Sequence, residues 1–265
     1  MRTNKLKQNI RNKVPSLGLS ISSWASPDLA EYLGYSGWDF LWMDVEHGSY
    51  SLNDIAHIAR ACDVAGASSM ARISKPNSPA DLLGYMETGI QGIVMPHVHS
   101  RADVELLVEG TKYYPIGKRS AGAMRPGNFG VGMNAADYYR RANEESLLVA
   151  LVEDVEGIEN IDEIVSVPEL DVLLVGPGDL ALAMGVAGQK GNPEVRAAVR
   201  HAEARAKAAG KATMRLVNTP TEATEAAEDG ADLIWTTIRH LMGAACPPWI
   251  NSMPAKAPEA VGTGD

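Results

Sequence analysis

Two acidic residues lie close behind two apolar segments in the middle of the chain. Glu153 directly follows Leu147–Val152, and Asp179 lies shortly after Val172–Val175. Apolar runs of this length are typical of strands that are buried on both faces. Because the residues between the two runs place apolar side chains at helical intervals, the segment indicates a strand–helix–strand unit with a carboxylate near the end of each strand.

These two carboxylates predict a metal site. In parallel α/β proteins, ligands bind at the carboxyl ends of the strands. Two carboxylates held there repel each other, and no Lys or Arg close in the sequence neutralises Glu153 or Asp179. A bound divalent cation relieves this repulsion. For Asp179 alone, the alternative is an N-cap of the helix that follows it.

A glycine-rich turn precedes Asp179. Gly176, Pro177 and Gly178 come directly after the second apolar run, and glycine lets the backbone approach a ligand closely. If a helix begins at Asp179, the backbone N–H groups of Gly178 and Asp179 point into the site and can bind an anion such as a carboxylate. The turn therefore predicts a place for an anionic substrate.

Two further side chains with useful chemistry stand at strand ends. His47 follows the second predicted strand, where a group that titrates near neutral pH is well placed for proton transfer. Arg72 lies at the end of the third strand and can present its planar guanidinium to a substrate carboxylate. The alternative for Arg72 is a structural ion pair with Glu153 or Asp44.

Other residues keep rival chemistries open. Lys75, just beyond the third strand, raises the possibility of a Schiff-base aldolase, although its place before a Pro in a solvent-facing loop predicts a poor nucleophile. His97 and His99 lie near the end of the fourth strand with the same parity. A His/His/acid metal site is therefore an alternative to the paired carboxylates.

The elements that carry these residues alternate along the chain and predict a (β/α)8 barrel, in the α/β class. The predicted strands are Leu17–Ser22, Phe40–Val45, Ser69–Ile73, Gly92–Val98, Leu147–Val152, Val172–Val175, Thr213–Val217 and Leu233–Thr237. The predicted helices are Pro27–Leu33, Leu52–Val64, Pro79–Glu87, Ala102–Gly110, Ile158–Val165, Pro193–Ala209 and Pro220–Asp229. We expect one barrel domain over residues 1–253, with an N-terminal helix at the barrel bottom, and a disordered tail over residues 254–265.

Two segments interrupt this alternation. Thr111–Ala142 is long and rich in glycine, and its position after the fourth strand predicts that it lies across the catalytic face. Leu241–Ile250 is apolar and contains a tryptophan. It either covers a neighbouring subunit's barrel or packs on its own barrel.

Composition excludes several classes of function. The net charge of −9 over 265 residues, without a basic stripe, argues against a nucleic-acid-binding protein. No apolar run is long enough to span a bilayer, and the basic N-terminus lacks the apolar centre of a secretory signal. Cys62 and Cys246 are far apart and lack metal-ligand spacing, so they are expected to be free thiols of a cytoplasmic protein.

Taken together, the motifs resemble the HpcH/HpaI family of metal-dependent pyruvate aldolases. The matching segments occur in the family's order and cover the chain from about Leu17 to Met242. They are Asp44–Gly48, Arg72, Glu87–Pro96, Tyr114–Ser120, Glu153 and Gly176–Leu180.

The resemblance implies a set of ligands. A divalent metal, with Mg²⁺, Mn²⁺ or Co²⁺ as candidates, would be held by Glu153 and Asp179. Pyruvate would chelate that metal, assisted by Arg72 and by the Pro177–Asp179 turn, through the amides of Gly178 and Asp179.

The resemblance also implies catalytic roles. His47 would act as the base through water, on the strand that also carries the catalytic residue Asp44, and Glu87 would be the partner of His47. Glu87 stands where the family commonly has Asp. Leu151 stands where the family often has Gln, so one polar group that would support the pyruvate or the metal is missing.

The implied activity is the reversible cleavage of a 4-hydroxy-2-oxoacid to pyruvate and an aldehyde through a metal-bound enolate. One alternative is a related barrel lyase acting on a CoA ester or malyl-type substrate, with its phosphates near Lys112, Lys118, Arg119 and Arg125. Another is a descendant that performs 2-oxoacid decarboxylation or carbon–carbon bond formation. The family often forms trimers of dimers, so a homohexamer is expected.

Overall fold

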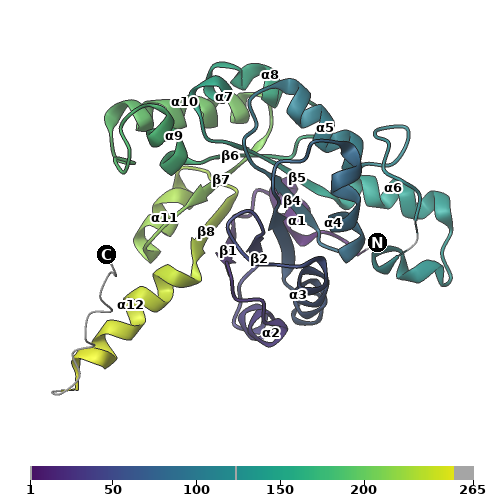
Figure 1. Cartoon of the computed structure of the whole chain (residues 1–265), viewed down its shortest axis with the longest axis horizontal. Helices are drawn as coiled ribbons and strands as arrows, with labels where there is room; N and C mark the ends of the chain where they lie inside the picture. The colour runs from purple at the N-terminus through teal and green to yellow at the C-terminus, as the bar shows by residue number, and fades with distance from the viewer. Residues whose placement is uncertain (1, 123, 254–265) are drawn as a thin grey trace, which may run out of the picture.

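Eight parallel strands close into a barrel in the computed structural model, which describes residues 2–122 and 124–253. Each strand pairs with the next in the sequence, and β8 pairs with β1 (Figure 1). The predicted (β/α)8 barrel is therefore confirmed. The strands are β1 (Ser16–Ser20), β2 (Phe40–Asp44), β3 (Ser68–Arg72), β4 (Gly92–Met95), β5 (Leu147–Val152), β6 (Val172–Val175), β7 (Ala212–Leu216) and β8 (Leu233–Thr237).

Most of the helices pack around the outside of the barrel, whereas α12 extends away from it (Figure 1). The helices are α1 (Lys5–Asn12), α2 (Pro27–Tyr35), α3 (Leu52–Ala65), α4 (Leu83–Thr88), α5 (Arg101–Thr111), α6 (Ala135–Glu145), α7 (Val155–Glu159), α8 (Ile161–Val165), α9 (Pro177–Ala183), α10 (Pro193–Ala208), α11 (Pro220–Glu228) and α12 (Ile238–Asn251), with 3₁₀ turns η1 (Pro79–Leu82) and η2 (Arg125–Gly130). Among these, α6 and α12 were not among the predicted helices, because glycine and proline in their sequences or nearby masked the helical spacing.

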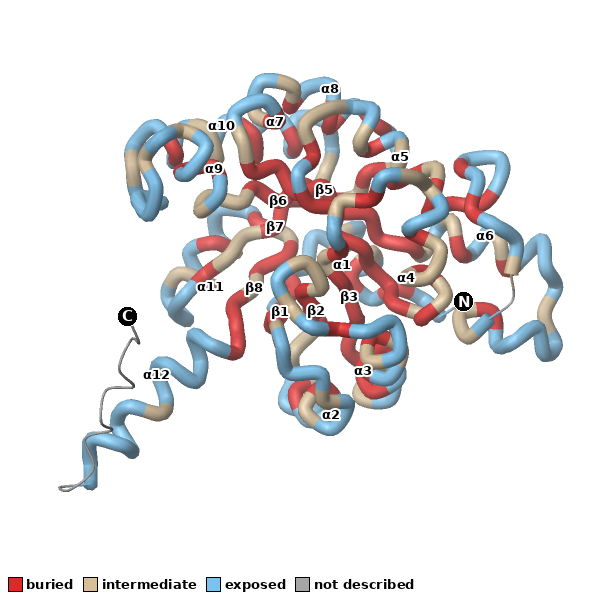
Figure 2. Tube along the Cα trace, viewed as in Figure 1, coloured by how far each residue is buried: buried red, intermediate tan, exposed pale blue. Residues whose placement is uncertain are grey.

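Alternate strand residues fill the barrel. Phe40, Trp42, Leu151 and Leu174 belong to the cluster of buried side chains inside it, and Leu6 of α1 joins them with no exposed surface. The predicted N-terminal helix is thus present and contributes a side chain to the core. Figure 2 shows the strands largely buried and the outer faces of the surrounding helices exposed. The continuous apolar runs follow from this burial, since the helices cover the outward side chains.

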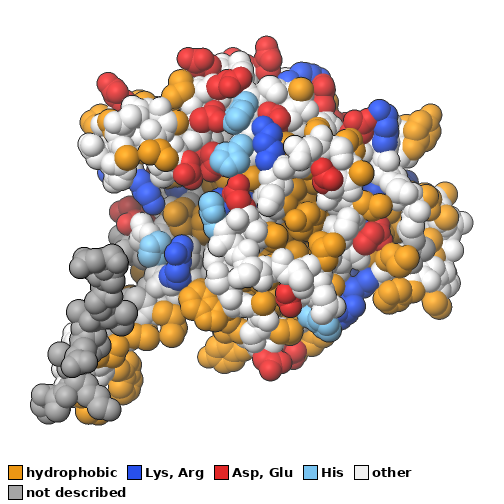
Figure 3. Space-filling view, in the orientation of Figure 1, with side chains coloured by type: hydrophobic (Ala, Val, Ile, Leu, Met, Phe, Trp, Pro, Cys, Tyr) orange, Lys and Arg blue, Asp and Glu red, His pale blue; other side chains and the backbone are white. Residues whose placement is uncertain are grey.

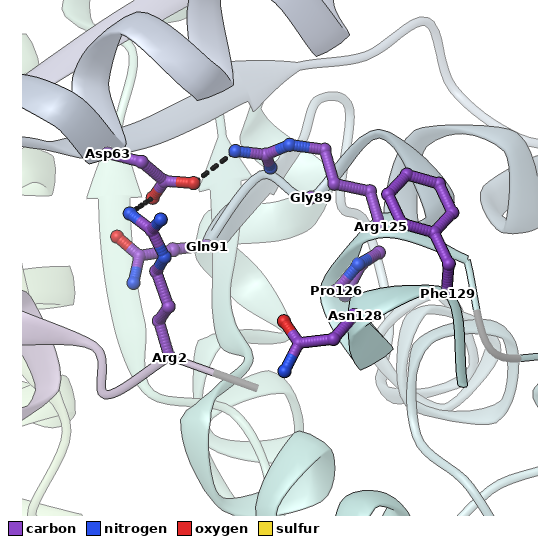
Figure 4. Close-up of a pocket in the computed structure, with 8 residues that line it drawn as sticks. All are labelled: Arg2, Asp63, Gly89, Gln91, Arg125, Pro126, Asn128 and Phe129. Atoms are coloured by element: carbon purple, nitrogen blue, oxygen red, sulfur yellow. Dashed lines mark hydrogen bonds and ion pairs between the residues drawn. The ribbon is translucent and has the colours of Figure 1, made fainter. Parts of the chain in front are cut away.

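The prediction that Thr111–Ala142 lies across the catalytic face is wrong. Helix α5 runs back along the barrel from the end of β4, so the segment starts at the opposite, amino-terminal end of the strands. There Arg125 donates a hydrogen bond to the Thr88 carbonyl at the end of α4 and binds Asp63. Figure 4 shows Arg125 and Arg2 pointing toward the Asp63 carboxylate in a pocket at this end.

Helix α12 projects away from the barrel (Figure 1). It is exposed along nearly its whole length in Figure 2, and its apolar side chains Met242, Trp249 and Ile250 are 51, 80 and 51% exposed. Within the chain, therefore, this segment does not pack on its own barrel. The tail predicted to be disordered, 254–265, lies outside the described residues.

None of the helices in residues 2–122 and 124–253 combines the length and the apolar character needed to cross a membrane.

Candidate active site

Five of the predicted site residues surround one cavity at the carboxyl ends of the strands. Arg72, Glu153, Pro177, Gly178 and Asp179 line a space of about 150 Å³. The register explains why they meet: β5 and β6 are neighbours, with Val152 opposite Val175, so the residues that follow them emerge side by side. On the face seen in Figure 3, acidic, basic and histidine side chains gather over the centre of the barrel.

Glu153 is a buried carboxylate in the wall of this cavity, only 3% exposed. Its Oε1 atom accepts a hydrogen bond from the backbone N–H of His97 (3.0 Å) and lies 3.2 Å from the His97 Nδ1 atom. A Cβ atom on Gly176 would stand 3.0 Å from Glu153 Oε2, so glycine is needed there to accommodate the carboxylate. Burial, together with the negative charges of Asp179 and Glu46, raises the pKa of Glu153.

Asp179 lies in the first turn of α9. The helix begins at Pro177 with Gly176 as its N-cap, so Asp179 is not the capping residue. The helix therefore starts two residues earlier than the expected start at Asp179. The N–H groups of Gly178 and Asp179 still belong to the first turn, where backbone donors have no partner within the helix.

Arg72 is held by two carboxylates of β2 and its following loop. Its Nε and Nη2 atoms donate to Asp44 Oδ1 (2.9 Å) and Oδ2 (2.5 Å), and its Nη1 atom lies 3.3 Å from Glu46 Oε2. Asp44 is directly opposite Arg72 in the β2–β3 register. Although burial acts to lower it, the contacts with Asp44 and the charges of Glu46 and Glu153 raise the pKa of Arg72. The hydrogen bonds to Asp44 use two of the five guanidinium N–H groups, so others remain for a ligand.

The two histidines of this region differ in exposure. His47 is on the rim, with its side chain 69% exposed and its Nε2 atom 4.0 Å from Glu46 Oε2. His97 instead lies between Glu153 and Glu46, with Nε2 3.1 Å from Glu46 Oε1. Sequence reasoning placed His97 only in an alternative metal site. His97 lies beyond β4, which ends at Met95, earlier than predicted, and its backbone is left-handed (φ 53°).

Within one chain, the structure does not bring Glu87 to His47. Glu87 lies near the end of α4, at the amino-terminal end of the barrel, whereas His47 follows β2 at the opposite end. The Glu87 carboxylate accepts a hydrogen bond from Arg119 Nη2 (2.7 Å). The expected pairing of Glu87 with His47 overlooked the direction in which the helices of a barrel return.

The rival chemistries lose their structural basis. Lys75 Nζ donates to the His97 carbonyl (2.6 Å) and pairs with Asp103 (3.0 Å), so its amine is engaged in a structural contact. His99 Nε2 pairs with Asp154 Oδ2 (2.5 Å), which separates it from the cavity. The basic residues suggested for CoA phosphates each have partners of their own away from the cavity mouth: Lys112, Lys118, Arg119 and Arg125.

Sequence reasoning missed the tryptophans at the floor of the cavity. Trp42 and Trp235 both line it, with ring centroids 4.1 Å apart, next to Leu151 and Leu174. Trp42 faces the interior as every second residue of β2 does, a signal already present in the sequence. The register of β1 with β2 and β8, which brings Trp235 beside Trp42, could not be derived from the sequence.

The donor set fits a hard divalent cation. Glu153 and Asp179 supply carboxylate oxygens, and the raised pKa of Glu153 shows that a nearby positive charge would stabilise its ionised form. In the described part of the chain, no group of three or more His, Cys, Asp or Glu is arranged to hold a metal. Two protein carboxylates suit Mg²⁺-type ions, which take their remaining ligands from substrate and water.

Comparison with known proteins gives consistent matches. The family described as HpcH/HpaI aldolase/citrate lyase matches residues 21–238. The chain is 31% identical over 234 residues to the 5-keto-4-deoxy-D-glucarate aldolase of Escherichia coli K12, covering 87% of this chain and 89% of that one. It is 33% identical over 211 residues to the hydroxypyruvate/pyruvate aldolase of Pseudomonas aeruginosa, covering 79 and 77%.

A solved structure agrees with these relatives. The HpcH/HpaI aldolase/citrate lyase family protein of Burkholderia cenocepacia J2315 superposes with a TM-score of 0.85 at 29% identity, covering 94% of this chain and 99% of that one.

Proposed function

Because the chain belongs to the HpcH/HpaI aldolase/citrate lyase family, we propose that it is a class II aldolase that reversibly cleaves a 4-hydroxy-2-oxoacid to pyruvate and an aldehyde. As a carbon–carbon lyase it needs to bind a 2-oxoacid and to stabilise negative charge on it. The observation that carries the proposal is that Arg72, Glu153 and Asp179 line one small cavity at the carboxyl ends of the strands. We also propose that the enzyme acts in the cytoplasm, because both of its cysteines, Cys62 and Cys246, are free thiols.

Glu153 and Asp179 would hold the divalent metal, for which Mg²⁺, Mn²⁺ and Co²⁺ are all candidates. When bound, the ion supplies Lewis-acid polarisation of the 2-oxo group. Glu153 is positioned for this by the backbone N–H of His97 and by the space beside Gly176.

Arg72 would bind the substrate carboxylate. Its contacts with Asp44 and Glu46 fix the guanidinium plane, and the N–H groups that Asp44 does not use are left for the ligand. The backbone N–H groups of Gly178 and Asp179, which line the same cavity, are further donors to the substrate.

His47 would act as the base. Its exposed ring on the rim can accept a proton from the 4-hydroxyl group through water during cleavage, and from the methyl group of pyruvate in the reverse direction. Asp44 contacts both the base and the residue that would bind the substrate carboxylate. It accepts a hydrogen bond from the His47 backbone N–H (3.3 Å), and it binds the Arg72 guanidinium.

Exchange of pyruvate methyl protons tests this function without knowledge of the aldehyde. In D₂O, the enzyme with Mn²⁺ or Mg²⁺ is expected to deuterate pyruvate, as followed by NMR, to stop when EDTA is added, and to recover with metal. His47→Ala is expected to abolish the exchange, whereas His57→Ala, which alters a histidine on α3, is the matched control. Exchange that continues in EDTA, or borohydride trapping of pyruvate on Lys75, would contradict the proposal.

Metal affinity should fall in acid earlier than for an ordinary carboxylate site. Burial and the neighbouring Asp179 and Glu46 raise the pKa of Glu153, and only its ionised form binds a cation. Below that pKa a proton competes with the metal, so the dissociation constant for Mn²⁺ is expected to rise about tenfold per pH unit. Calorimetric titrations with Mn²⁺ at several pH values from about 4.5 to about 8 measure this change in the dissociation constant.

Glu46→Gln provides the comparison for this pH profile. Removing the Glu46 charge lowers the pKa of Glu153, so the loss of Mn²⁺ affinity should begin at a lower pH. A profile that is identical in the two proteins would show that the Glu153 carboxylate does not control metal binding.

Helix α12 is the proposed contact between subunits of a homohexamer. Trp249 and Ile250 are exposed in the single chain, and an apolar helix that leaves its own barrel needs another surface to cover it. Sedimentation should give six times the chain mass of 28.3 kDa. Trp249→Glu is expected to yield smaller species, and Val64→Glu, on an exposed apolar position of α3, should not. Unchanged sedimentation of Trp249→Glu would refute this role for α12.

A further inference from the structure

A second cation lines the cavity besides Arg72. Lys190 lies in the loop between α9 and α10, which are neighbours on the barrel (Figure 1), and its side chain forms part of the cavity wall together with Glu153 and Asp179. A Cβ atom on Gly178 would stand 3.3 Å from the Lys190 Cε atom and 3.7 Å from its Nζ atom. The ammonium group therefore lies against the Gly178 backbone, next in the chain to a proposed metal ligand.

Local hydrogen bonds fix the backbone of this loop. The Gln189 N–H donates to the Val186 carbonyl (3.0 Å), and the Asn192 N–H donates to the Gln189 carbonyl (2.9 Å). Gly188, whose φ is 76°, supplies the left-handed position that the first of these two turns requires. Val186 also packs against the buried side chains of the core. The second turn therefore holds the Lys190 backbone in a defined place, from which the side chain reaches the cavity.

Within the described residues, the charge of Lys190 has no protein partner. Apart from Lys13, the other lysines of the described chain each bind a carboxylate or a backbone carbonyl: Lys5, Lys7, Lys75, Lys112, Lys118, Lys207 and Lys211. Lys190 makes no hydrogen bond or ion pair with a described residue, although Asp179 lines the same cavity. Its ammonium group is therefore available to a ligand.

The charges around the cavity require such a cation. Four carboxylates lie in the cavity or beside it: Asp44, Glu46, Glu153 and Asp179. Arg72 and a bound divalent cation together supply three positive charges, so one negative charge remains when the histidines are uncharged. Lys190 balances that charge, and an anionic substrate then meets a neutral cavity instead of a repulsive one.

We propose that Lys190 is a substrate-binding residue, whose ammonium group binds the carboxylate of the 2-oxoacid from the β6 side of the barrel, whereas Arg72 approaches it from the β3 side. The inference rests on the proposed function and adds a residue to its substrate site. The cavity of about 150 Å³ has about the volume of five water molecules, so a group in its wall lies close to any 2-oxoacid that fills it.

This role predicts an effect on binding and not on the chemical step. The charge of the substrate carboxylate does not change during the reaction, so Lys190 stabilises the substrate and the transition state equally. For pyruvate proton exchange, Lys190→Met is therefore expected to raise KM while kcat stays nearly unchanged. A group that acts in the chemical step would instead lower kcat.

Calorimetric titration of the full-length, Mn²⁺-loaded protein with pyruvate, and with oxalate as a planar dianionic analogue, tests the proposal. Because the ammonium group is exposed and partly screened by solvent, Lys190→Met is expected to weaken the binding of each ligand about tenfold. Lys190→Arg keeps the charge and should stay within about threefold of the unaltered protein. Lys13→Met, which removes a lysine at the C-cap of α1, is the matched control and should change neither affinity.

The metal affinity of the same variants separates a lost ligand contact from a damaged site. Removing a positive charge next to Asp179 should leave the dissociation constant for Mn²⁺ unchanged or lower it, because like charges repel. If Lys190→Met lost Mn²⁺ and oxalate together, Lys190 would serve only to support the loop, and the proposal would be wrong.

Two other results would contradict the proposal. Equal affinity of Lys190→Met and the unaltered protein for pyruvate and oxalate would mean that the ammonium group stays in solvent. Weaker binding of 2-oxoglutarate alone would mean that Lys190 binds a distal carboxylate and not the carboxylate of the 2-oxoacid group. If the unaltered, metal-loaded protein bound neither pyruvate nor oxalate, the proposed function itself would fail, and this inference with it.

Discussion

Glu153→Gln is expected to lower the metal-dependent exchange of pyruvate methyl protons by at least about a thousandfold, because a bound cation contributes several kcal/mol of charge stabilisation. The amide keeps the size of the side chain and can still accept from the His97 backbone N–H, but it lacks the negative charge. Calorimetric titration with Mn²⁺ should show the corresponding loss of metal affinity.

The location of Glu153 makes this substitution informative about stability as well. The carboxylate is 3% exposed and lies beside Asp179 and Glu46, whose charges oppose its ionisation. Removing its charge relieves that repulsion, so the metal-free variant should unfold at the same or a higher temperature than the metal-free parent. Glu159→Gln, on the exposed surface of α7, is the matched control and should change neither property. Retained Mn²⁺ binding in Glu153→Gln would rule out this carboxylate as a ligand.

The barrel and the meeting of Glu153 with Asp179 were predictable because both depend on local pattern. Apolar runs of four to six residues alternate with helical spacing. A carboxylate placed after each of two consecutive parallel strands must reach the same rim. The same logic predicted that Arg72 lies at this rim, because Asp44 and Arg72 stand at the ends of adjacent strands.

What could not be predicted depends on strand register and on backbone detail. Trp42 and Trp235 are distant in sequence, and their rings meet through the register in which β1 pairs with β2 and with β8. His97 reaches Glu153 through a left-handed backbone that no strand pattern indicates. For Glu87, by contrast, the error was avoidable, since barrel helices end at the rim opposite the site.

Arg72→Met is expected to affect both activity and folding, because Arg72 is the cation shared by two largely buried carboxylates. Its side chain is 14% exposed, and those of Asp44 and Glu46 are 11 and 13% exposed. Loss of the guanidinium removes the cation that Asp44 and Glu46 share, which should lower the free energy of unfolding by about 3 kcal/mol. The kcat/KM for the aldol reaction should fall by about a thousandfold, as when a donor to a developing oxyanion is removed.

A compensated variant separates these two consequences. In Arg72→Met/Asp44→Asn/Glu46→Gln no unpaired charge remains beside the cavity, so urea unfolding should recover much of the lost stability. Activity should stay low, because the substrate carboxylate still lacks its bidentate partner. Arg72→Lys should also stay impaired, since an ammonium keeps the charge without the planar fork. If the compensated variant regained activity along with stability, Arg72 would serve only to hold β2 and β3 together, and the carboxylate of the substrate would have to be bound by the turn at Gly178.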